Sequence, residues 1–339
     1  KTLALNATPT DFAEWTVDEV AGVTNGFSIA STPDGQPLVV ANSTGVYRFV
    51  PKGDCAEYPE AQLNATGEPF KGTNPDGTVF GYAETHMHLL GSEALGGKIG
   101  YGRPFHKFGI THAMGDCSVD HGPEGSAAVL DHTLGGGSTT PGGGPANRHD
   151  TVGWPTYKDW PKWPSQGHHQ TYYMWVKRTW MGGLRFMVNH FVENEVLCTV
   201  WPQKENNCNE MISAAHQRRL LLEMQDYIDA QEGGPGQGFF RIVYTPQEAR
   251  RVIEAGKLAV VMGIETEKVF DCGEYLDTAE CTREQLIPRM DQWYAMGVRF
   301  VFPIHIFDIG FGGSEISRFT GDTALIQLFN AGNVVETGH

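Results

Sequence analysis

The stretch Leu258-Ala-Val-Val-Met-Gly-Ile264 is an unbroken apolar run, which is typical of a strand buried on both faces of a parallel sheet. A helix is predicted directly before it, because Thr245-Pro-Gln-Glu248 is a capping box with proline at the first helical position, and Gly256 ends the segment. Phe239–Tyr244, which precedes that helix, has the composition of another strand. The sequence therefore predicts a strand–helix–strand unit over residues 239–264.

The same alternation extends toward both ends of the chain. Helices are predicted at 170–181, at 209–231, after the capping box Thr282-Arg-Glu-Gln285 and at about 323–331. Further strands are predicted at 78–85, 184–190 and 299–304, the first of them buried. The helix after Thr282 is expected to bury one apolar face, which carries Leu286, Met290, Trp293 and Tyr294. Strands and helices that alternate in this way predict an α/β fold with a parallel sheet.

A TIM-type (β/α)8 barrel is the favoured architecture, and a doubly wound sheet is the alternative. No Gly-x-Gly-x-x-Gly follows the first strand, and candidate ligands stand at several different strand ends, as barrels arrange them. About five or six strands are predicted, and these would leave open edges in an eight-stranded barrel. We therefore expect an incomplete barrel whose remainder lies beyond His339, on a companion chain or in a longer polypeptide.

Two regions depart from the alternation of strands and helices. Residues 1–75 are expected to form a small β-rich unit, because β-prone runs such as Gly45–Val50 are separated by turn signals such as Asp34-Gly35. The barrel part spans residues 76–339 and contains a long insertion, rich in glycine and aromatic residues, at about 91–168. A loop of this length is often functional.

The insertion and the residues after it contain many aromatic and histidine side chains. The aromatic series could line a substrate cleft or pack the loop: Trp154, Tyr157, Trp160, Trp163, Tyr172, Tyr173 and Trp175. Loops position ligands less accurately than strands, so the histidines of this stretch are expected to be poor metal ligands: His106, His112, His121, His132, His149, His168 and His169.

Charge and hydropathy argue against nucleic-acid binding and against a transmembrane segment. The net charge is −15, and the 25 Lys and Arg residues are scattered along the sequence, whereas a phosphate-binding surface needs them clustered. We therefore expect no nucleic-acid partner. No run of about 18 apolar residues exists, so no transmembrane segment is expected either.

Cysteines and glycosylation sequons favour a secreted protein. Cys198/Cys208 and Cys272/Cys281 would each close a short loop, and the remaining disulfide candidates are Cys55 and Cys117. Buried free thiols in a cytosolic protein are the alternative. Three Asn-x-Thr sequons favour the oxidising compartment and make glycosylation candidates of Asn6, Asn42 and Asn64.

His86 and His88 stand two residues apart at the end of the first predicted strand. Residues i and i+2 of a strand point to the same face, so both imidazoles can reach one cation, and Glu84 shares that face. This arrangement predicts His86 and His88 as metal ligands.

The motif around this pair resembles the amidohydrolase superfamily, in which an Asp/Glu-x-His-x-His/Asp sequence follows the first barrel strand. Leu258–Glu265 resembles the membrane (renal) dipeptidase family, where Gly-Val/Ile-Glu at a strand end supplies a carboxylate that bridges two zinc ions. Met290–His305 is similar to the next helix–strand unit of that family, which ends in a substrate-binding histidine. The resemblance implies Glu265 as a metal ligand, His305 as a substrate-binding residue, and one or two zinc ions or a similar divalent metal as cofactor.

The chain departs from these dipeptidases at two points. They have His-x-Asp where this sequence has His86-x-His88, and their remaining metal histidines and catalytic aspartate would lie beyond residue 339. The expected function is a secreted metal-dependent hydrolase that cleaves an amide bond in a dipeptide-like substrate, or an ester bond, with a metal-activated water. The alternatives are a catalytically inactive binding or structural protein on the same barrel and a one-metal, deaminase-like hydrolase.

Overall fold

The computed structural model describes residues 15–31, 35–50, 53, 57–128, 130, 148–160, 167–313 and 324–333. The chain forms two compact units, Lys1–Glu57 and Tyr58–His339. The second unit thus begins before residue 76, because the segment after Tyr58 packs on the helices that follow the insertion. The Tyr172 hydroxyl, for example, donates to the Glu60 carboxylate at 2.5 Å, and Arg178 donates to the carbonyl of Leu63.

The first unit contains a β-hairpin. Strands β1 (Trp15–Glu19) and β2 (Phe27–Ser31) pair antiparallel, with Trp15 opposite Ser31. Single bridges add Tyr47 and Pro37 to β2. The hydrophobic side chains described in this unit are all at least partly exposed, so the hairpin rests mainly on backbone hydrogen bonds.

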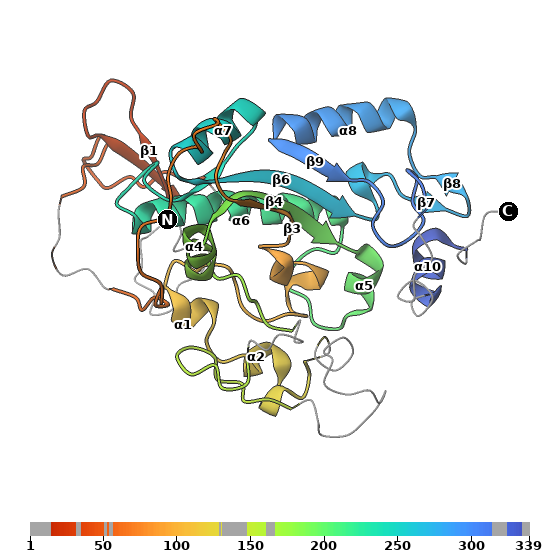
Figure 1. Ribbon diagram of the computed structural model, residues 1–339. Coiled ribbons are helices and arrows are strands. Elements are labelled where there is room, and N and C mark those ends of the chain that lie inside the picture. The colour runs from red at the N-terminus through yellow and green to blue at the C-terminus, as the bar shows by residue number, and fades with distance from the viewer. Residues whose placement is uncertain are drawn as a thin grey trace. The chain divides into compact units, whose positions relative to one another are not determined.

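The second unit is built on a parallel sheet, as predicted (Figure 1). Its strands are β3 (Tyr82–Met87), β4 (Leu184–Glu193), β5 (Phe240–Ile242), β6 (Leu258–Thr266) and β9 (Val298–Phe302). Their order is β3-β4-β6, and the far edge of β6 pairs with β5 at its beginning and with β9 at its end. The sheet is open within the described residues, so the α/β class holds and barrel closure is not seen. Two short strands, β7 (Glu274–Tyr275) and β8 (Thr278–Ala279), form a separate hairpin.

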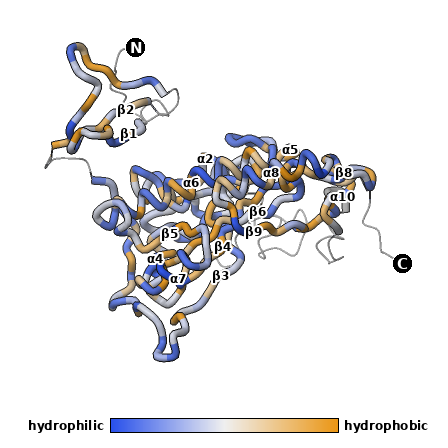
Figure 2. Tube along the Cα trace, turned by 90° about the horizontal axis from the view of Figure 1, so that it is seen from above, coloured by the Kyte–Doolittle hydropathy of each residue, from blue (hydrophilic) through white to orange (hydrophobic). Residues whose placement is uncertain are grey.

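Helices pack on both faces of this sheet. They are α4 (Tyr173–Met181), α5 (Glu195–Val200), α6 (Glu210–Gln231), α7 (Pro246–Glu254), α8 (Arg283–Ala295) and α10 (Ala324–Ala331). Leu221, Met224 and Ile228 of α6 belong to the same buried core as Met187 and Met262 of the sheet. Figure 2 shows hydrophobic stretches gathered along β4, β6 and β9. The capping box predicted at Thr245 is present and begins α7.

One face of the sheet carries an apolar groove of about 890 Å³ beside α7. Its walls include Phe186, Val188, Val261 and Phe300, which lie on alternate positions of neighbouring strands. The expectation that the first strand is buried was wrong. Residues Tyr82–His86 of β3 are exposed, because β3 is an edge strand and this face is open.

The helix predicted after Thr282 is α8, but its apolar face is not buried as expected. Trp293 is buried, whereas Met290 and Tyr294 are 43% and 64% exposed. The reason lies in the next strand, where the Arg299 guanidinium stacks over the Tyr294 ring at 3.8 Å and keeps it at the surface.

The insertion is more ordered than a structureless loop. Its described parts contain the short helices η2 (Gly91–Glu93), η3 (Leu95–Gly97), α1 (Ile110–Ala113), α2 (Ser118–His121) and η4 (Pro123–Gly125). Trp160, Tyr172 and Tyr173 are buried in the main core, which supports packing as the role of these aromatic residues. Trp163 and His132 lie outside the described residues.

Two disulfides close the loops that the cysteine spacing predicts, Cys198–Cys208 and Cys272–Cys281. The expectation that Cys117 belongs to a disulfide was wrong: it is a buried thiol whose sulfur lies 3.2 Å from Nε2 of His149. Cys55 lies outside the described residues. Among the described helices, none has the length and apolar character needed to cross a membrane.

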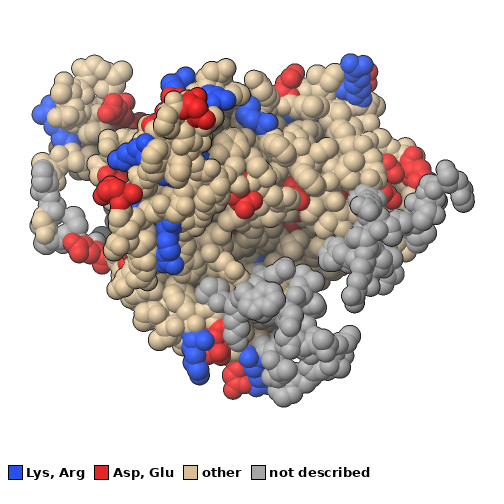
Figure 3. All heavy atoms as spheres, viewed as in Figure 1, with Lys and Arg blue, Asp and Glu red and all other residues tan. Residues whose placement is uncertain are grey.

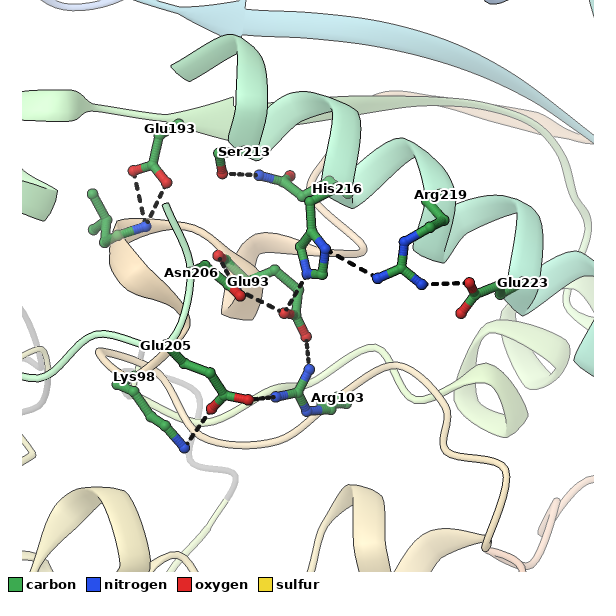
Figure 4. Close-up of polar contacts among 12 residues, drawn as sticks. Glu93, Lys98, Arg103, Glu193, Glu205, Asn206, Ser213, His216, Arg219 and Glu223 are labelled. Atoms are coloured by element: carbon green, nitrogen blue, oxygen red, sulfur yellow. Dashed lines mark hydrogen bonds and ion pairs between the residues drawn. The ribbon is translucent and has the colours of Figure 1, made fainter. Parts of the chain in front are cut away.

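The segment that follows the His86–His88 pair is anchored by Glu93 (Figure 4). This carboxylate is 2% exposed, binds Arg103, and lies 3.2 Å from His216 Nε2 and 3.0 Å from Asn206 Nδ2. Burial raises the pKa of Glu93, but His216 and the charge of Arg103 outweigh burial and lower it below its usual value of 4.5. The network thus ties η2 to helix α6 and to the loop before it.

Replacing Glu93 by glutamine (E93Q) is expected to lower the free energy of unfolding by about 2 kcal/mol, because charged hydrogen bonds to a buried group are lost. The wild-type pKa is lowered by folding, so this stabilisation is present above pH 4.5 and is lost as the pH falls below it. Denaturant unfolding across pH measures both effects. E223Q is the control, since the Arg219–Glu223 pair is exposed and contributes roughly 0.3–0.5 kcal/mol. Equal stability of the two variants at pH 7 would contradict the prediction.

Candidate metal centre

The carboxyl ends of the parallel strands meet at one edge of the sheet, and the predicted site residues lie there. His86 is on β3 and His88 directly follows that strand, Glu265 is the last but one residue of β6, and His305 follows β9. Ligands in parallel α/β sheets bind at this edge, because loops of different strands converge on it. The structure therefore brings together the four residues that the sequence singled out.

His86, His88 and Glu265 form a close cluster. Oε2 of Glu265 lies 2.7 Å from Nε2 of His86 and 3.3 Å from Nε2 of His88, and the two nitrogens are 3.2 Å apart. Zinc–ligand bonds of about 2.0–2.2 Å place neighbouring ligand atoms roughly 3.3 Å apart in a tetrahedron. The observed separations fit three ligands of one ion, and the partly exposed imidazoles leave a side open to solvent.

The Glu265 carboxylate supplies an independent test of this fit. It is 2% exposed, and its Oε2 accepts no hydrogen bond of acceptable geometry from any described residue, although two imidazole nitrogens lie beside it. A buried carboxylate oxygen without a hydrogen-bond donor is costly unless a cation balances it. Together, Oε2 and the two imidazole nitrogens match the donor set that zinc and related divalent ions prefer.

His305 lies on the opposite side of the same carboxylate. Its Nε2 is 3.1 Å from Oε1 of Glu265, and its Nδ1 is 3.1 Å from Oε1 of Glu267. Burial lowers the pKa of His305, but the adjacent Glu267 carboxylate and the charge of Glu265 outweigh it and raise the pKa above 6.5. The two carboxylates thus favour the protonated form of the His305 ring that lies between them.

His190, on β4, is a further histidine beside the site. It is 1% exposed on β4, its ring centre lies 4.9 Å from that of His86, and its Nε2 lies 3.3 Å from the Thr85 carbonyl. A side chain at Gly263 would crowd it, since a Cβ there would lie 2.9 Å from Nδ1 of His190. His190 lies on the same face of β4 as Phe186 and Val188, which line the groove. That alternation in the sequence could have placed its ring beside the predicted metal ligands.

Glu267 was not predicted at all, although a signal existed. Glu265 and Glu267 stand two residues apart at a strand end, which is the same relation that singled out His86 and His88. Glu267 is 1% exposed and receives the backbone amides of Ile306 and Phe307 at 3.3 and 3.4 Å. It therefore fixes both the His305 ring and the turn that carries it.

The electrostatics of the remaining imidazoles suit metal binding. Burial lowers the pKa of His88 and outweighs the opposing charge of Glu265. Burial also lowers the pKa of His190. Since metals bind the neutral imidazole, these shifts keep both rings neutral at physiological pH.

Other predicted residues lie elsewhere. Glu84 is exposed and its carboxylate accepts the backbone amide of His86 at 3.1 Å, so it orients the motif from outside. Asn42 and Asn64 are exposed, Asn6 lies outside the described residues, and glycosylation stays a prediction for all three. On the face drawn in Figure 3, basic side chains are spread among acidic ones and form no single patch.

A second group of potential metal ligands lies in the insertion, away from the sheet edge. It consists of Cys117, His121, His149 and His168. The sequence predicts poor metal ligands among the histidines of the insertion, but the structure buries these three and brings their ligand atoms close together.

Comparison of the chain with protein-family models, with curated proteins and with solved structures finds no match.

In chelator-treated protein, we expect His305 to titrate above pH 6.5 and the substitution E267Q to bring its pKa down, because one of two adjacent carboxylate charges is removed. The folded pKa is raised, so the stability that His305 contributes is fully present below pH 6.5 and is lost as the pH rises through the folded pKa. NMR titration of the imidazole protons measures the shift. E223Q should leave it unchanged. A His305 pKa at or below 6.5 in the wild type would refute the assignment.

Proposed function

We propose that this protein is a metal-dependent hydrolase that cleaves an amide or ester bond of a small, dipeptide-like substrate. The observation that carries the proposal is the buried Glu265 carboxylate, whose Oε2 faces His86 and His88 while its Oε1 faces His305. The proposed cofactor is zinc or a similar divalent ion. His86, His88 and Glu265 would hold this ion.

A divalent ion in this position supplies Lewis-acid polarisation of a carbonyl and lowers the pKa of water, which amide or ester hydrolysis at neutral pH requires. The chain's own residues add orientation and proton control. His305 lies between the carboxylates of Glu265 and Glu267, which favour its protonated form, so it could donate a proton or a hydrogen bond to a substrate carbonyl that enters beside Glu265. The buried His190 ring packs against the His86 ring and would help to orient it.

The proposed architecture is a TIM-type barrel of which these strands form a part. The sheet presents an apolar, partly exposed face whose residues alternate along the strands, as barrel interiors require. The resemblance of residues 258–265 and 290–305 to the renal dipeptidases supports the same reading. The two disulfides support a secreted, oxidising location.

Hydrolysis of a panel of dipeptides, acylated amino acids and aryl esters by the zinc-loaded protein tests the proposal. E265Q and H86A should each reduce kcat/KM by more than about 100-fold, since even outer partners of metal ligands contribute roughly 10–100-fold. H112A is the matched control, because His112 is exposed in the insertion and contacts other residues than the site. Activity that survives E265Q and H86A, or zinc-loaded protein without activity on the whole panel, would overturn it.

A further inference from the structure

Four potential metal ligands of the insertion converge from three separate chain segments. Cys117 directly precedes helix α2, and His121 is the last residue of that helix, so a single turn places both on one side. His149 and His168 come from later segments on either side of Trp160. Convergence of side chains so far apart in sequence requires the insertion to fold around them.

The four ligand atoms are close enough to share one ion. All of them lie within 4.8 Å of one another, and the Cys117 sulfur is 3.2 Å from Nε2 of His149. Tetrahedral zinc, with bonds of about 2.0–2.1 Å to nitrogen and 2.3 Å to sulfur, places neighbouring ligand atoms roughly 3.3–3.6 Å apart. The cluster is thus near the size of a coordination shell before any adjustment of side chains.

The imidazole rings also have the arrangement that a common centre imposes. The ring centres of His121, His149 and His168 are 5.6, 4.7 and 4.7 Å apart, and the rings are inclined to one another by 83–88°. Three imidazoles bound to one tetrahedral ion have ring centres roughly 5 Å apart. The nearly perpendicular planes exclude parallel stacking among the three rings.

We propose that Cys117, His121, His149 and His168 bind a structural zinc ion. The four residues are 0%, 1%, 8% and 4% exposed, so solvent has no access to a fifth position. Four protein ligands in a closed, buried shell are typical of structural zinc, whereas catalytic zinc keeps an open position. The thiolate among the ligands separates this site from the one at the sheet edge, which has only imidazole and carboxylate donors.

Neighbouring residues restrict the orientation of two imidazole rings in the cluster. Trp160 stacks on the His168 ring with centres 4.5 Å apart and planes inclined by 21°. Gly125 lies so close to His149 that a Cβ there would come within 2.2 Å of the ring, and its φ of +69° also suits glycine. Both contacts fix ring orientation, as groups around a metal ligand commonly do.

The site would join the insertion to the segment that leaves the candidate active site. His168 pairs by a β-bridge with Tyr101, and the backbone amide of His169 donates to the Tyr101 carbonyl at 2.7 Å. Asp120, inside helix α2, pairs with Lys98 at 3.1 Å. Zinc binding would therefore hold the stretch between His88 and Arg103 in place without taking part in the chemistry.

Cobalt substitution of the full-length protein tests this site. Metal-free protein loaded with Co(II) should show thiolate-to-cobalt charge-transfer absorption in the near ultraviolet together with intense visible bands of tetrahedral cobalt. C117S should abolish the charge-transfer absorption, while C55S, the matched control, keeps it. By elemental analysis, the zinc content of C117S and of H149A should fall by one ion per chain, whereas H86A retains that ion.

The wild-type spectrum decides the matter even if the variants fold poorly. The proposal would be overturned if Co(II)-loaded wild-type protein showed no thiolate charge-transfer absorption. It would also be overturned if C55S removed that absorption and C117S did not. Failure of the hydrolase proposal can be told apart from this. In that case C117S and H149A would still lose one zinc ion per chain, but hydrolysis would not depend on His86 and Glu265.

Discussion

A carboxylate buried at the end of the central strand is the constraint on which the candidate metal centre of this structure depends. Glu265 is 2% exposed, and an ionised carboxyl in such a place must be balanced by cations, protons or hydrogen-bond donors. His86, His88 and His305 surround it, but they leave Oε2 without a hydrogen bond. The arrangement is therefore stable as a metal ligand set and costly as a simple ion pair, which is why it supports a metal centre.

The fold explains how such a carboxylate can be held. β6 is paired on both edges along nearly all its length and is packed on α6, so its carboxyl end is fixed from three sides. Parallel pairing then brings the ends of β3, β4 and β9 to the same edge, and each contributes an imidazole. Rigid strands position these ligands, while the Glu93 network and the proposed zinc site of the insertion hold the segment that follows His88.

Much of this arrangement could be predicted from the sequence, because its signals are local. The apolar run at 258–264, the capping box at Thr245 and the His-x-His spacing each depend on a few neighbouring residues, and all correspond to features of the structure. The exposure of β3 could not be predicted, since it depends on which strand lies at the sheet edge. The exposure of Tyr294 depends on Arg299 of the next strand. The Cys117 cluster joins residues up to 51 positions apart, and no periodicity connects them.

An X-ray anomalous difference map of zinc-grown crystals, recorded on both sides of the zinc absorption edge, tests the central claim most directly. We predict one peak among His86 Nε2, His88 Nε2 and Glu265 Oε2, with the His305 ring turned toward the same pocket. A well-ordered site with protein side chains in these positions and no anomalous density among them would contradict the account.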